Sequence, residues 1–195
     1  VKYSVGFGKR YFKTMWAICR GVKCVTEQDI QYALGRHLFL KNVCIPNVLM
    51  SGVKKAPYEA DFIYFNLNKL HLTEVEIKTD INDFRNDFKK ARYHDNHNVM
   101  YLYYAFPRSL YDDYYDVIDT LLGDAGLILI DEYSGTHFEK PVYEVGGFVK
   151  KAKRRKDSIK LSEKEKEYYL RIGCMKWVNR WMIERKGTMK EALIK

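Results

Sequence analysis

The chain has 195 residues, of which 47% are hydrophobic and 15% aromatic, which is enough apolar material for the core of one domain. No apolar run approaches the roughly 18 residues that a membrane-spanning helix needs, and no signal-peptide pattern is present, so we expect a soluble, cytoplasmic protein without membrane contact. The net charge of +9 is uneven, because residues 150–195 hold 16 Lys and Arg against 6 Asp and Glu.

The first part of the chain predicts helices followed by three strands. Aromatic residues recur at helical spacing in RYFKTMWAIC (10–19), which indicates a short helix. A second helix begins with Thr26 as N-cap and Asp29 three residues later, a variant of the capping box. Its apolar stripe is Ile30, Leu34 and Leu38. Three strand-like runs follow at 42–50, 59–66 and 70–78.

The next segments alternate between helix and strand. A helix is expected after Thr79 or Asp80, with a buried stripe of Ile81, Phe84, Phe88 and Ala91. A strand over 98–106, a helix over 109–122, an apolar strand at 126–130 and a further strand around 142–145 complete the order. Strongly apolar strands with helices between them predict an α/β domain over residues 1–149, with a sheet covered by helices on both faces.

The C-terminal part changes in composition. Residues 150–161 are expected to form a basic linker. Residues 162–195 are expected to form a helical appendage that begins at a Ser162–Glu165 capping box and ends with a separate short helix after Thr188. We expect Trp177 and Trp181, four residues apart, to pack back on the core. The alternative is a face of these helices that binds a protein partner or a second copy of the chain.

The strand EVEIKTD (74–80) raises a question of chemistry. Its alternation puts Glu74, Glu76 and Lys78 on one face of the strand. If the hairpin of the second and third strands turns symmetrically about Asn68 and Lys69, opposed residues have numbers that add to 137, and Asp61 lies across from Glu76. Two carboxylates and one ammonium then meet on the same face.

Two carboxylates inside a covered sheet repel each other and lose hydration, so a cation is expected between them. Lys78 supplies one positive charge, and Mg²⁺ or Mn²⁺ would supply the rest, because these ions prefer carboxylate oxygens. Glu27 lies on the stripe of Ile30 and Leu34, where a carboxylate needs a partner. It either joins the site or interacts with the helix dipole.

Asp61 followed by Glu76-Ile77-Lys78, in the order helix, three strands, helix, strand, resembles the PD-(D/E)XK nuclease superfamily. The continuation TDINDFRNDFKKARY, with Asp83, Asp87 and Lys89, resembles the branch of MmcB-like DNA repair proteins. The resemblance covers about residues 25 to 132 and implies a restriction-endonuclease-like core (α-β-β-β-α-β) with a central mixed sheet flanked by helices. Ala60 stands where the motif has Pro.

The resemblance implies a metal-dependent deoxyribonuclease of DNA repair, recombination or phage DNA processing. Asp61, Glu76 and the backbone carbonyl of Ile77 would bind the metal, Lys78 would assist the attacking water, and Glu27 would join the network. The alternative is an inactive nucleic-acid-binding module with the same fold.

The partner expected from the charge distribution is DNA. KKAKRRK (150–156) has six cations in seven positions, a density suited to a phosphate backbone. The residues expected to contact it are Lys89, Lys90, Lys153, Arg154 and Arg155. The alternative for this segment is a solvated linker.

Overall fold

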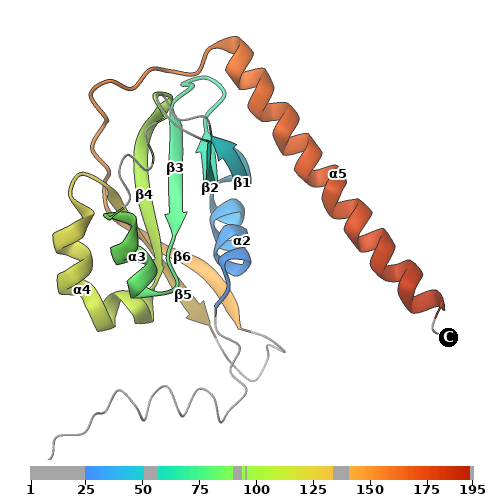
Figure 1. Ribbon diagram of the computed structural model, residues 1–195, viewed down its shortest axis with the longest axis horizontal. Coiled ribbons are helices and arrows are strands. Elements are labelled where there is room, and N and C mark those ends of the chain that lie inside the picture. The colour runs from blue at the N-terminus through green and yellow to red at the C-terminus, as the bar shows by residue number, and fades with distance from the viewer. Residues whose placement is uncertain (1–24, 51–56, 90–93, 95, 134–140, 194–195) are drawn as a thin grey trace, which may run out of the picture.

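The computed structural model describes residues 25–50, 57–89, 94, 96–133 and 141–193 (Figure 1). The elements in chain order are α2 (Glu27–Leu38), β1 (Val43–Met50), β2 (Tyr58–Phe65), β3 (Leu72–Ile77), α3 (Ile81–Asp87), β4 (Val99–Pro107), α4 (Arg108–Leu122), β5 (Gly126–Tyr133), β6 (Val142–Lys150) and α5 (Glu163–Leu193). The predicted order is confirmed from the capped helix to the strand around 142–145. The helix expected at 10–19 lies outside the described residues.

A six-stranded mixed sheet forms the centre of the domain. Its strands lie in sequence order, β1 to β6. The pairs β1–β2, β2–β3 and β5–β6 are antiparallel, and β3–β4 and β4–β5 are parallel. The predicted α/β class with a central mixed sheet is therefore confirmed.

The predicted hairpin register between β2 and β3 is also confirmed. Every recorded pair has numbers that add to 137: Phe62 with Val75, Ile63 with Glu74, Tyr64 with Thr73, and Phe65 with Leu72. Continuing this register by one residue brings Asp61 beside Glu76. Side chains at directly opposed positions lie on the same face, with Cβ atoms about 5 Å apart.

Local capping signals begin the first two helices where they were predicted. Thr26 and Asp29 form the reciprocal capping box of α2. Asp80 caps α3, because its carboxylate accepts hydrogen bonds from the backbone N–H groups of Asn82 and Asp83. These bonds satisfy backbone donors that have no partner inside the helix.

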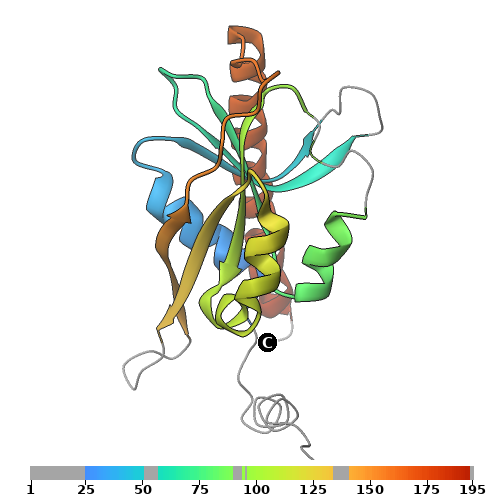
Figure 2. The same cartoon turned by 90° about the vertical axis from the view of Figure 1, so that its left-hand side faces the viewer.

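Helices cover both faces of the sheet (Figures 1 and 2). On one face, α2 packs its buried stripe against β2, β3, β4 and β5. On the other face, α3 and α4 cover β4 and β5, and the beginning of α5 covers β1 and β2. All six residues of β3 are buried as a result.

The predicted stripe of α3 is wrong at one position. Ile81 and Phe84 are buried, but Phe88 is 46% exposed and caps the end of the helix. Asp87 is buried instead, because its carboxylate forms an ion pair with the buried Lys78. Ala91, the fourth predicted member, lies outside the described residues.

Residues 151–161, the expected linker, run across the amino ends of the parallel strands without forming a helix or strand. Backbone N–H groups of this segment donate to carbonyls beside three strands: Lys153 to Asp124, Arg155 to Met100, and Leu161 to Leu70. The segment is thereby attached to the sheet at several points.

The helix α5 continues to Leu193 as one element, without the separate last helix expected after Thr188. Its first turns pack on the sheet, where Tyr169 is 5% exposed and Gly173 faces Ile45. Trp177 and Trp181 are 59% and 56% exposed. The expectation that they pack on the core is wrong for the described residues, because α5 extends away from the sheet before reaching them (Figure 1).

No helix in the described part of the chain combines the length and the apolar character needed to cross a lipid bilayer.

Candidate metal centre on strand β3

Asp61 and Glu76 lie side by side on β2 and β3, as the hairpin register requires. Asp61 Oδ2 accepts a hydrogen bond of 2.8 Å from the backbone N–H of Ile77. Burial raises the pKa of Asp61 to about 6, against the opposing effect of that hydrogen bond, and the Glu27 carboxylate raises it further. Asp61 is only partly buried, so its carboxylate lies at the edge of the site.

Glu76 lies deeper in the sheet and is 1% exposed. Burial raises its pKa well above the ordinary value, and the charges of Asp61 and Glu74 act in the same direction. Lys78 opposes this shift. Among the described residues, Glu76 Oε1 is buried and has no hydrogen-bond partner. An acceptor of this kind is costly to bury without a cation or a donor.

Lys78 is 4% exposed and lies among three carboxylates. Its Nζ is 2.7 Å from Asp87 Oδ2, 2.9 Å from Asp83 Oδ2 and 3.6 Å from Glu76 Oε2. Burial lowers the pKa of Lys78, but the hydrogen bonds to Asp87 and Asp83 outweigh it, and the net pKa is raised. Lys78 is therefore a permanent cation near neutral pH and cannot accept a proton from water there.

Glu27 is exposed, so the prediction that it belongs to the buried stripe of α2 is wrong. Its first-turn position leaves the side chain at the rim of the sheet. Its Oε1 nevertheless accepts hydrogen bonds from Gln31 (2.7 Å) and Asn47 (3.0 Å). Gln31 also donates to the backbone carbonyl of Asp61 at 2.9 Å. Glu27 is thus connected to the Asp61 end of the site through an amide network.

Two further residues that the sequence reasoning did not choose belong to this cluster. Glu74 is fully buried, and its Oε1 is hydrogen-bonded to Nδ1 of His94. The same nitrogen is 3.7 Å from Glu76 Oε1. The period of two along β3 already put Glu74 on the face of Glu76. No local signal brings His94 there, since it follows α3 in a turn with a left-handed φ of 63°.

The residues expected to contact DNA are dispersed. Lys89, after α3, is exposed and donates to Asn86 at 3.0 Å. Lys153 and Arg154 are exposed, and Lys153 Nζ lies 2.8 Å from Asp124. Arg155 is partly buried and donates to the backbone carbonyl of His94. Lys90 lies outside the described residues.

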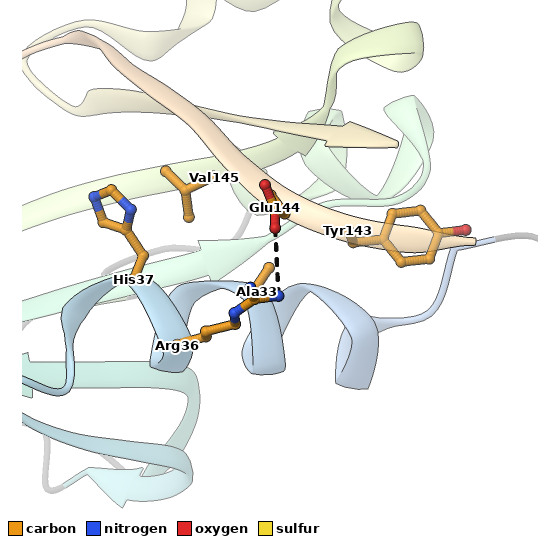
Figure 3. A pocket seen from close by; sticks show the side chains of 6 residues that line it. All are labelled: Ala33, Arg36, His37, Tyr143, Glu144 and Val145. Carbon is orange, nitrogen blue, oxygen red and sulfur yellow. Dashed lines mark ion pairs between the residues drawn. The ribbon is translucent and has the colours of Figure 1, made fainter. Parts of the chain in front are cut away.

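A pocket on the α2 side of the molecule is separate from this cluster (Figure 3). It lies between α2 and β6, and Arg36 and Glu144 form an ion pair across it at 3.3 Å. Its other lining residues are Ala33, His37, Tyr143 and Val145. It contains neither a buried charge nor a member of the β3 cluster.

Comparison of the chain with protein-family models, with curated proteins and with solved structures gave no match.

The β3 face gathers more acidic than basic side chains. Five carboxylates surround it, from Asp61, Glu74, Glu76, Asp83 and Asp87, against the cation of Lys78 and the imidazole of His94. Burial raises the pKa of both neighbouring carboxyl groups, Asp61 and Glu76. The charge of Asp61 raises the pKa of Glu76 further, whereas the hydrogen bond between the two side chains lowers the pKa of Asp61. A divalent cation bound among these carboxylates would relieve both their repulsion and their lost hydration.

Proposed function

We propose that the chain is a Mg²⁺- or Mn²⁺-dependent nuclease that hydrolyses phosphodiester bonds of DNA. The observation that carries the proposal is the meeting of Asp61 and Glu76 in one hairpin register, with Lys78 on the same face. The element order α2-β1-β2-β3-α3-β4 agrees with the helix, three strands, helix and strand of the nuclease superfamily that the motif resembles.

The residues present fit a divalent ion. Asp61 and Glu76 would hold it together with the backbone carbonyl of Ile77, and Glu76 Oε1 has no hydrogen-bond partner among the described residues. A bound ion would make water nucleophilic near neutral pH and neutralise charge on the phosphate. The partial exposure of Asp61, and of the Asp83 side chain at 56%, leaves this edge of the site open to a substrate.

Lys78 has an electrostatic role in this proposal. Since its pKa is raised, it stays charged and stabilises negative charge that develops on the phosphate. Its Nζ donates a hydrogen bond to Asp83 and forms an ion pair with Asp87, and these two contacts hold the cation in place. Asp61, with a pKa of about 6, is ionised above that pH. The rate of hydrolysis is therefore expected to rise as the pH passes through 6.

The deciding experiment measures cleavage of single-stranded, duplex and branched DNA in Mg²⁺ and in Mn²⁺. We expect Asp61→Asn and Glu76→Gln each to reduce the rate at least about 100-fold. The matched control is Glu59→Gln, an exposed carboxylate two residues before Asp61 on β2, which should leave the rate unchanged. Cleavage that survives excess EDTA, or survives in the Asp61 variant, would contradict the assignment.

The second candidate function is a DNA-binding module without turnover. The observation that favours it concerns Lys78, which forms ion pairs with three carboxylates while its side chain is 5% exposed. An ion network that only stabilises the fold would have the same contacts. Calorimetry separates the two functions. DNA binding without any uptake of Mn²⁺ would replace the first proposal with this one.

DNA is also the proposed partner of the basic segment. Lys153 and Arg154 lie by the amino ends of the parallel strands β5 and β4, whereas Lys78 follows the carboxyl end of the parallel strand β3. The length of β3 therefore separates them by at least about 20 Å. A duplex that contacts both would extend over about six base pairs. The double variant Lys153→Glu, Arg154→Glu should weaken DNA binding and reduce the slope of log affinity against log salt by about 2.

Arg155 is left unchanged in that test because it holds the backbone of His94. Lys164→Glu, an exposed cation at the start of α5, is the control for nonspecific loss of charge. An unchanged salt slope in the double variant would show that the basic segment does not contact DNA.

A further inference from the structure

A second group of ligands adjoins the proposed nuclease centre. One ligand atom from each of Glu74, Glu76 and His94 lies within 4.8 Å of the others, and all three residues are buried. We infer that these three side chains form a separate binding site for a divalent transition-metal ion, with Glu76 contributing to both sites. The inference shares Glu76 with the proposed function but can hold or fail without it.

The burial of the two carboxylates favours a cation beside them. Glu74 and Glu76 are 0% and 1% exposed, so neither carboxylate is stabilised by water. Lys78 does not serve this purpose for Glu74, because its ammonium is bonded to Asp83 and Asp87. Glu76 Oε1, on the side of His94, is buried and accepts no hydrogen bond from any described residue.

The surroundings hold the ligands in fixed orientations. The hydroxyl of Tyr58 donates to Glu74 Oε2 at 2.8 Å, which leaves Oε1 directed at His94. The imidazole is perpendicular to the rings of Tyr58 and Tyr104, with 5.6 Å and 6.4 Å between ring centroids. Partners that orient ligands in this manner are a general feature of protein metal sites.

The position of His94 in the chain is fixed as well. Its backbone has φ 63°, a conformation that non-glycine residues rarely adopt. Arg155 donates to its carbonyl, and the backbone N–H of Arg155 donates to Met100 on β4. The basic segment therefore holds the histidine against β3 from outside the sheet.

The donor set determines the class of metal. Two carboxylates with one imidazole suit Mn²⁺, Co²⁺ or Zn²⁺, whereas Mg²⁺ prefers oxygen ligands alone. The site should accordingly discriminate against Mg²⁺, in contrast to the all-oxygen set of Asp61, Glu76 and the Ile77 carbonyl. Mg²⁺ and a transition metal would then occupy different positions along β3.

The test is a titration of the full chain, free of any affinity tag and treated with a chelator, with Co²⁺ in the presence of excess Mg²⁺. Visible absorption of the bound ion reports binding. We expect His94→Gln and Glu74→Gln to weaken the tightest Co²⁺ binding at least 10-fold. His97→Gln, at an exposed histidine of the same loop, should change it less than about 2-fold.

X-ray absorption of the wild-type chain with one equivalent of Zn²⁺ covers the case in which a variant fails to fold. An imidazole ligand is expected in the wild type and in the His97→Gln protein. Its absence from the wild type, or unchanged Co²⁺ affinity in folded His94→Gln and Glu74→Gln proteins, would overturn the inference.

The two proposals separate by their outcomes. Mg²⁺-dependent hydrolysis that is lost in Asp61→Asn, combined with a negative Co²⁺ result, leaves the nuclease standing without the second site. Co²⁺ binding that depends on His94, in a chain that cleaves no DNA, supports the second site and removes the nuclease.

Discussion

The strand β3 and the helix α5 both depart from the usual rule that charged residues lie at the surface and apolar residues in the interior. β3 carries Glu74 and Glu76 in the interior, at 0% and 1% exposure. The distal part of α5 carries Trp177, Trp181 and Ile183 at the surface, each more than half exposed. A buried charge destabilises the fold unless an opposite charge or a hydrogen bond compensates it. An exposed apolar side chain only fails to add the stability that its burial would give. Changes on β3 should therefore have larger effects than changes at the end of α5.

The largest effect is expected from Lys78→Met in the metal-free protein. Removal of the ammonium leaves Glu76 and Asp87 buried without their cation, and the free energy of unfolding should fall by about 3 to 5 kcal/mol. Urea denaturation in EDTA measures it. The double variant Lys78→Met, Asp87→Asn should recover part of the loss, because the two residues are in direct contact. A loss no greater than that of Lys164→Met, on the exposed side of α5, would mean that β3 does not depend on this cation.

The next largest loss of stability is expected in the first turns of α5, where a buried and an exposed tyrosine are neighbours in the sequence. Tyr169 is buried, lies against Phe65 with 6.2 Å between ring centroids, and its hydroxyl is 3.6 Å from Met50 Sδ. Tyr169→Ala should lower the free energy of unfolding by about 3 kcal/mol. The neighbouring Tyr168 is 55% exposed, so Tyr168→Ala should cost less than about 0.5 kcal/mol. Equal losses for the two variants would show that the first turns of α5 are not attached to the sheet.

Asp61→Asn should increase the stability of the metal-free protein. The folded-state pKa of about 6 exceeds the ordinary value of 3.8, so the folded state binds more protons than the unfolded state between these values. Wild-type stability therefore falls as the pH rises from about 4 to 6, and the variant avoids this part of the fall.

The expected gain is about 1 to 3 kcal/mol at pH 7 and close to zero at pH 4, from urea denaturation in EDTA at both pH values. Asn can still accept the hydrogen bond from Ile77. Glu59→Gln serves as the control and should show no such difference. A variant less stable than wild type at pH 7 would indicate that the Asp61 carboxylate stabilises the fold.

The smallest effect is expected at the exposed tryptophans. Trp177 and Trp181 contact each other with 5.3 Å between ring centroids but are more than half exposed. Replacing both with Ala should change the free energy of unfolding by less than about 1 kcal/mol. Sedimentation at several concentrations must accompany the measurement. A larger loss that grows with protein concentration would show that α5 pairs with a second copy of the chain.

The sequence-based prediction was accurate where the determining contacts are local. The capping box of Thr26 with Asp29 joins residues three apart, and the cap by Asp80 acts on the next turn. The register that puts Asp61 beside Glu76 depends only on the symmetry of a short turn and on the two-residue period of a strand. Glu27 was misjudged because helical periodicity says which side of a helix a residue takes, but not how far the sheet extends beneath the first turn.

The sequence by itself determined the α/β class, the order of its elements and the shared face of Asp61, Glu76 and Lys78. Each of these follows from hydrogen bonds and periodicities within a few residues or within one hairpin. Only the tertiary structure decided that His94 reaches Glu74, 20 residues earlier in the chain, and that Arg155 fixes it there. It also decided that α5 leaves the sheet before its tryptophans. These outcomes depend on packing between segments that are distant in the sequence. Local sequence patterns do not distinguish between the alternative ways in which such segments can pack.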